Sequence, residues 1–220
     1  MIPAAFKAMR DLFSPEFRSV LLRAVGMALL LFTAILVGVE VLLGHLSTIP
    51  WAWAETLAAI GAGLVLVVAF FFMMSPVVAI FAGLFLDNIA ARVEQRHYPQ
   101  DAAGTPLSGT RAMSTSLQFA GLVLLVNLAA LPLIFTGIGA AALVTINAYL
   151  LSREYFEMIA MRHLPVADAR RLRKQNAAAI FAAGFIPALL SLVPIVNLVV
   201  PLFATSYFVH IFKRAPALSP

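Results

Sequence analysis

The chain has 220 residues, of which 62% are hydrophobic and only 11% are charged. Soluble domains carry about a quarter charged residues, so this composition excludes an ordinary soluble enzyme and indicates a chain that lies mostly in lipid. The net charge of +5 suits the anionic headgroups of membrane lipids, and no aromatic-rich basic surface indicates a nucleic acid partner.

The first predicted element is an amphipathic helix over residues 3–13. Its apolar side chains, among them Phe6 and Met9, share one helical face, while Lys7 and Asp11 lie on other faces. A helix of this kind lies in the plane of the membrane interface. We therefore expect an interfacial helix before the first membrane crossing.

Two long apolar helices follow. Ser14 and Pro15 are typical of a helix cap and a first helical turn, which places the first long helix at residues 15–44. The second is predicted at residues 57–95, after a short outer loop that contains Trp51. Its length exceeds what the hydrocarbon core requires, so it is expected to tilt, kink or continue into the cytoplasm.

The second half of the chain repeats one layout twice, as predicted hairpins at residues 117–151 and 177–212. Their bends fall near residues 136–139 and 193–197, and proline or asparagine interrupts the arms. At membrane depth, backbone groups freed by proline must be satisfied by protein or trapped water. Re-entrant hairpins and four ordinary spans therefore both remain open from these residues alone.

Lysine and arginine lie on one side only of every hydrophobic segment. The outer loop and both hairpin bends carry none of the 15 positive charges. This pattern follows the positive-inside rule and predicts that both termini are cytoplasmic. The whole chain, residues 1–220, is expected to form a single all-helical membrane domain.

Residue types needed for catalysis are scarce. The chain has no cysteine, which excludes disulfides, thiolate metal sites and cysteine nucleophiles. The four histidines, at positions 45, 97, 163 and 210, fall in separate segments without helical spacing, a pattern that argues against a metal site. No phosphate-binding loop or serine nucleophile motif is present. The sequence predicts no enzyme, no cofactor and no metal.

Arg18 and Arg23 lie near the start of the first long helix. A helix start offers unpaired backbone N–H groups and a positive dipole, and a guanidinium adds donors that suit a tetrahedral oxyanion. These residues therefore predict an anion-entry site. The alternative is that both arginines anchor the helix at the level of the lipid headgroups.

A second polar group follows the first hairpin, at Arg153, Glu154 and Glu157. These side chains can form an ion-pair network with the arginines of the first long helix, or can solvate the base of the hairpin.

Asn127 and Asn197 each lie near a proline within a hairpin. They line a polar path or satisfy the interrupted backbone, and the sequence does not distinguish the two.

Three motifs together resemble a known family. They are Pro15-Glu16-Phe17-Arg18 before the first long helix, Thr136-Gly137-Ile138-Gly139 at the first bend, and Val193-Pro194-Ile195-Val196-Asn197-Leu198 at the second. Over nearly its whole length the chain resembles the CysZ sulfate permeases of bacterial inner membranes. That family is related to eukaryotic etoposide-induced membrane proteins.

The resemblance implies two long transmembrane helices, two hemi-penetrating hairpins and a homo-oligomer built from dimers. It also implies sulfate uptake for cysteine biosynthesis, with an anion-binding motif at Glu16, Phe17 and Arg18, and Arg23 as a helper. Glu16 replaces the glycine of the family motif, and Ser19 replaces a second arginine. Two alternatives remain: a permease for another small anion, and a membrane-shaping or interaction protein that transports nothing.

Overall fold

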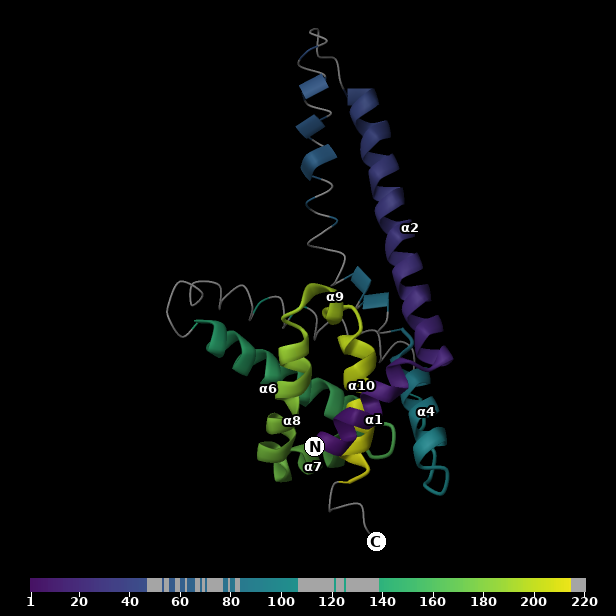
Figure 1. Cartoon of the computed structure of the whole chain (residues 1–220), viewed down its shortest axis with the longest axis vertical. Coiled ribbons are helices and arrows are strands. Elements are labelled where there is room, and N and C mark those ends of the chain that lie inside the picture. Colours follow the sequence, from purple (N-terminus) through teal and green to yellow (C-terminus); the bar gives the residue numbers. More distant parts are fainter. Residues whose placement is uncertain are drawn as a thin grey trace.

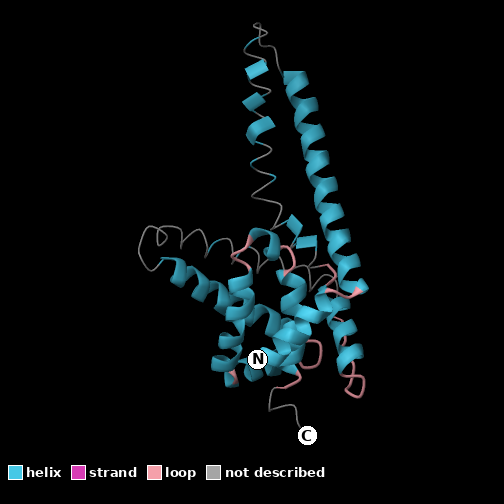
Figure 2. Ribbon diagram, in the orientation of Figure 1, coloured by secondary structure: helices cyan, strands magenta, loops and turns pink. Residues whose placement is uncertain are grey.

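The computed structural model describes most of the chain as helix (Figure 1). The described residues are 1–46, 53, 56, 57, 60, 61, 63–65, 68, 70, 77, 78, 80, 81, 84–106, 121, 125 and 139–214. Over these residues all regular structure is helical (Figure 2), which confirms the predicted all-helical class.

Eight helices have defined bounds within the described residues. They are α1 (Ile2–Leu12), α2 (Pro15–Leu46), α4 (Leu86–His97), α6 (Gly139–Ala160), α7 (Val166–Gln175), α8 (Ala177–Leu190), α9 (Pro194–Asn197) and α10 (Val200–Phe212).

Helix α2 rises away from a compact base formed by the other helices (Figure 1). Among the described helices, α2 alone is long and apolar enough to cross a membrane, over the 28 residues Pro15–Leu42. That length corresponds to about 42 Å, enough for a bilayer core. Phe17, Val20, Ala24 and Ala28 form a buried stripe that holds the lower half of α2 on the base.

The range 57–95 is not one uninterrupted helix, so that prediction is wrong at its end. A turn at Leu84 and Phe85 precedes α4, and the Leu84 N–H donates to the carbonyl of Phe81. The turn falls where the sequence changes from apolar to charged residues, at Asp87. Helix α4 then packs beside α10 in the base.

Helix α6 contains the predicted return arm of the first hairpin but continues beyond residue 151 to Ala160. The extension forms because Phe156, Ile159 and Ala160 are fully buried in the base. The preceding arm and the bend at 136–138 lie outside the described residues, apart from residues 121 and 125. Helix α6 crosses α8 at Gly184, where a Cβ atom would collide with the carbonyl oxygen of Ala148.

Helices α8 and α10 occupy the two arms predicted at 177–212, and α9 lies at their bend (Figure 1). Helix α10 is the centre of the base: every residue from Val200 to His210 is buried, and α10 contacts α1, α4, α6 and α8. Helices α8 and α10 are 14 and 13 residues long. Each therefore extends about 20 Å, less than a hydrocarbon core requires.

Helix α1 keeps Asp11 on a different face from Phe6 and Phe13, as predicted. The face that carries Asp11 is the buried one: Asp11 lies there together with Ala4 and Ala8, where α1 packs on α10. The two alanines allow this close approach because they have short side chains. The apolar side chains of Phe6 and Phe13 remain 68% and 76% exposed, as an interfacial helix requires.

Candidate functional site

The charged residues of α4 are sorted onto two opposite faces. Asp87 and Glu94 are seven residues apart, which places them on one helical face. Arg92 and Arg96 are four residues apart and share the other. The first face points into the base of the molecule, and the second contributes to a pocket. The position of α4 therefore decides where both pairs of charges lie.

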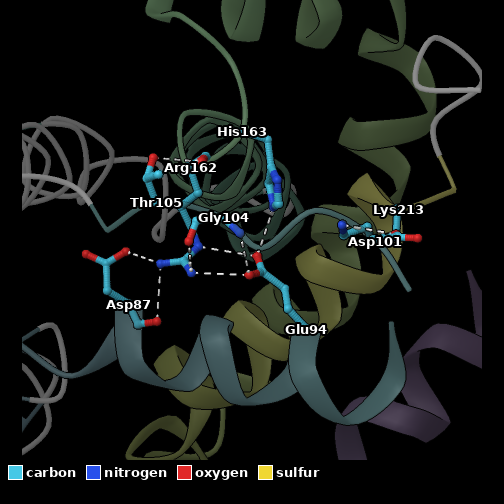
Figure 3. Close-up of polar contacts among 8 residues, drawn as sticks. All are labelled: Asp87, Glu94, Asp101, Gly104, Thr105, Arg162, His163 and Lys213. Carbon is cyan, nitrogen blue, oxygen red and sulfur yellow. Dashed lines mark hydrogen bonds and ion pairs between the residues drawn. The ribbon is translucent and has the colours of Figure 1, made fainter. Parts of the chain in front are cut away.

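Arg162 holds the inner face of α4 (Figure 3). Its side chain is fully buried, with Nη1 2.6 Å from Asp87 Oδ1 and Nη2 3.2 Å from Glu94 Oε2. His163 donates a further hydrogen bond to Glu94 Oε1 at 3.0 Å, and the backbone N–H of Gly104 donates to Glu94 Oε2 at 3.2 Å. This network joins α4 to the turn after α6 and to the loop at Gly104.

Glu94 remains ionised in this setting. Burial alone would raise the pKa of Glu94, but the hydrogen bonds from His163 and Arg162 and the charge of Arg162 outweigh it and lower the pKa to about 2. The Arg162 guanidinium is saturated, because it also donates to the carbonyl oxygens of Asp87 and Gly104. Arg162 therefore has a structural role, and it has no spare donor for a ligand.

The outer face of α4 borders a pocket at the start of α2. The pocket has a volume of about 350 Å³. Its walls come from the end of α1, the start of α2 and the outer face of α4; the lining residues are Asp11, Ser14, Pro15, Glu16, Phe17, Arg92, Val93, Gln95 and Arg96. Two guanidinium groups and a helix start thus meet in one concave site, which suits a small anion.

The first turn of α2 has backbone donors that the helix itself does not use. The first intrahelical bond of this turn runs from the N–H of Arg18 to the carbonyl of Ser14, at 3.1 Å. The N–H groups of Glu16 and Phe17 precede it, and Pro15 has none. The partial positive charge of the helix start is therefore directed at the pocket.

The Glu16 carboxylate competes with an external anion for this helix start. Its own backbone N–H, the Ser14 hydroxyl and the charges of Arg96 and Arg92 lower the pKa of Glu16. Glu16 thus acts as an internal anion in the pocket. Its side chain is exposed, so it can move aside when another anion binds.

The predicted anion residues divide into two groups. Glu16 and Phe17 line the pocket, and the Phe17 side chain packs into the core with 3% exposure. Arg18 and Arg23 are exposed on α2 and do not belong to the lining. The guanidinium groups at the pocket are instead those of Arg92 and Arg96.

The predicted network at Arg153, Glu154 and Glu157 exists in part, but with different partners. Glu157 is buried and accepts a hydrogen bond from Arg173 Nε of α7 at 2.6 Å. Arg153 and Arg170 lie farther from Glu157, at 3.9 and 3.8 Å. Among the described contacts, this cluster pairs α6 with α7, a helix that the sequence did not predict, and not with Arg18 or Arg23. Glu154 is partly buried on α6.

Asn197 lies at the bend of the second hairpin and does not line the pocket. Asn197 is the last residue of α9 and is partly buried, and its N–H donates to the carbonyl of Val193 at 2.8 Å. It therefore stabilises the bend of the second hairpin at backbone level. Asn127 lies outside the described residues, and its expected role stays a prediction.

Sequence reasoning missed Arg92 and Arg96 as site residues, because they were counted only as topology signals. The available signal was the amphipathic pattern of residues 87–96, in which Asp87 and Glu94 repeat on one face and the two arginines on the other. Pairing of that outer face with the start of α2 requires the tertiary structure.

Comparison with known families gives one match. Over residues 4–201 the chain matches the family described as sulfate transporter CysZ/etoposide-induced protein 2.4. This range contains every residue that lines the pocket, and the match confirms the resemblance inferred from the three motifs. Comparison with curated proteins gives no match.

Proposed function

Because the chain belongs to the sulfate transporter CysZ/etoposide-induced protein 2.4 family, we propose that it is a channel-like permease for sulfate. It takes up sulfate across the bacterial inner membrane and supplies cysteine biosynthesis. The process uses neither ATP nor a bound cofactor. The working unit is a homo-oligomer built from dimers, with both termini in the cytoplasm.

The observation that carries this proposal is the pocket between α2 and the outer face of α4. Arg92 and Arg96 supply two guanidinium groups, and the first turn of α2 supplies backbone N–H groups. Sulfate is a tetrahedral dianion that such donors can bind in place of water. In the proposed mechanism the anion displaces the Glu16 carboxylate, contacts the arginines and the helix start, and then enters the membrane path.

The half-length helices support a re-entrant path. Helices α8 and α10 are apolar but too short to cross a bilayer. In the proposal they enter from the cytoplasmic side and turn at α9 within the membrane. This hairpin then shortens the barrier that sulfate must cross.

Arginine substitutions in the pocket test the site. For Arg92→Ala with Arg96→Ala we expect sulfate affinity to fall at least ~tenfold, because charge-assisted hydrogen bonds contribute about 1.5–3 kcal/mol each and 1.4 kcal/mol is a factor of ten. The measurement is sulfate binding to the purified protein and sulfate flux into proteoliposomes. The matched control is Arg171→Ala, which removes an exposed arginine of α7 outside the pocket.

Arg18→Ala belongs in the same series, because Arg18 carries the arginine of the family-like motif. If Arg18→Ala abolishes sulfate binding while the Arg92 and Arg96 substitutions do not, the anion binds at Arg18 and the pocket assignment is wrong. If none of the three changes binding or flux, sulfate does not enter at the start of α2.

A second function is favoured by the exposed apolar face of α1. Ile2, Phe6 and Phe13 are 69%, 68% and 76% exposed, as in proteins that insert a helix into one leaflet to shape or recruit membrane. This function predicts no selective anion binding. Binding of sulfate measured against phosphate, nitrate and chloride therefore separates three outcomes: a sulfate permease, a permease for another anion, and a protein that transports nothing.

A further inference from the structure

We propose that Asp11, His97 and His210 form a binding site for a divalent transition metal ion of the Zn²⁺ type. The three residues come from α1, α4 and α10, so the ion would join three helices of the base. The sequence places these residues far apart, and only the fold brings them together. This proposal does not depend on the sulfate pocket.

The donor atoms already converge. His97 Nε2 lies 2.9 Å from Asp11 Oδ1, and His210 Nε2 lies 3.7 Å from Asp11 Oδ2. One donor atom from each residue falls within 4.8 Å of the other two. Bonds of ~2.0–2.1 Å to zinc in a tetrahedral site separate the ligand atoms by about 3.3 Å, so side-chain shifts of about 1 Å would complete the geometry.

His210 provides an independent indication of a ligand. Its side chain is fully buried, yet Nε2 has no hydrogen-bond partner among the described residues. A buried polar atom without a partner is costly, and such atoms often indicate a ligand or ion. This nitrogen lies 3.7 Å from Asp11 Oδ2, close to the separation of two atoms that bind one zinc ion.

The surrounding hydrogen bonds match the outer shell of a metal site. Tyr98 Oη lies 2.8 Å from His210 Nδ1. When Nδ1–H donates to Tyr98, the lone pair of Nε2 is left for the ion, which is the usual arrangement of a metal-bound histidine. Ser206 Oγ donates to Asp11 Oδ2 at 2.7 Å and orients the carboxylate.

Asp11 supplies the carboxylate of the proposed site. His97 Nε2 lies 2.9 Å from its Oδ1, and Ser206 Oγ donates to its Oδ2. Three cationic side chains are near the site. Arg96 Nη1 is 3.9 Å from Asp11 Oδ1 but is 60% exposed and can withdraw, while Lys7 and Lys213 lie 5.9 Å from the ring of Tyr98.

The test uses the full-length protein, purified in detergent and stripped with EDTA, and titrated with ZnCl₂ and CoCl₂. We expect one equivalent of Zn²⁺ per chain, and visible Co²⁺ absorption typical of nitrogen and oxygen ligands. His97→Gln should weaken Zn²⁺ binding by at least ~100-fold, because one of three protein ligands is lost.

His163→Gln is the matched control, because His163 is the histidine of the Arg162 network and should leave Zn²⁺ binding unchanged. His97 is partly exposed, so its substitution tests the site without emptying the core, and His210→Asn serves as a second variant. Absence of stoichiometric Zn²⁺ binding by the wild-type protein would overturn the proposal. Equal weakening by His97→Gln and His163→Gln would also overturn it, since binding would then be unspecific.

Discussion

The two faces of α4 carry opposite charges, carboxylates on the inner face and arginines on the outer face, and the surroundings hold them differently. On the inner face, Asp87 and Glu94 enclose the buried Arg162, and every donor direction of that guanidinium is occupied. On the outer face, Arg92 makes no ion pair with the described residues, and Arg96 makes one long contact of 3.9 Å to Asp11. One helix thus separates a structural cluster from the candidate anion pocket.

The difference teaches which arginines are available for a ligand. An arginine whose donors are all paired with buried carboxylates stabilises the fold. A ligand could bind it only by displacing those carboxylates, and they would then be buried without a partner or water. An exposed arginine such as Arg92 keeps its donors for an anion. Substitutions on the inner face should therefore change stability, and those on the outer face should change binding.

The largest expected effect is that of Arg162→Ala. It leaves Asp87 and Glu94 without their cation, and loss of one partner from a buried pair costs about 3–5 kcal/mol. The free energy of unfolding, measured by denaturant titration in detergent, should fall by that amount. Arg92→Ala is the matched control on the outer face. Because Arg92 is exposed, this substitution should change the free energy of unfolding by less than about 1 kcal/mol. Equal losses in the two variants would remove the distinction between the faces.

The second largest expected effect is that of acid on the free energy of unfolding, through Glu94 on the inner face. The pKa of Glu94 is lowered from 4.5 to about 2, so the folded chain gains stability at pH values above the unfolded pKa. That gain, about 3 kcal/mol in full, is lost as pH falls from about 5 through 2. Thermal unfolding of wild-type protein should show this loss, and Glu94→Gln should show a smaller pH dependence over the same window. Identical pH profiles would contradict the ionised state of Glu94.

The smallest expected effect is that of Glu16→Gln on the outer face. Removing this exposed carboxylate frees the helix start and both arginines, so sulfate should bind about two- to fivefold more tightly, the range of a solvent-screened pair. Sulfate titration of purified protein measures the change, and the free energy of unfolding should stay nearly constant. Weaker sulfate binding in Glu16→Gln would show that Glu16 is not a competitor of the anion.

Several features followed from local sequence alone. Ser14 and Pro15 correctly marked the start of α2, because cap and first-turn preferences depend only on neighbouring residues. The three motifs indicated the family that the comparison then found.

The predicted helix over 57–95 was wrong at Leu84 and Phe85, since a break between an apolar and a polar helix is set by packing against α10. The predicted end of the first hairpin at residue 151 also failed, because burial of Phe156 and Ile159 extends α6.

Composition by itself predicted the all-helical class that the structure shows, because lipid solvation acts on each segment separately. The topology that the order of Lys and Arg indicates stays a prediction. Only the tertiary structure decided which charges do what. Arg162 became structural and Arg92 and Arg96 became pocket residues because α4 turns one face to the core and the other to the start of α2. His97 and His210 likewise met Asp11 through the packing of α1, α4 and α10, which no sequence spacing encodes.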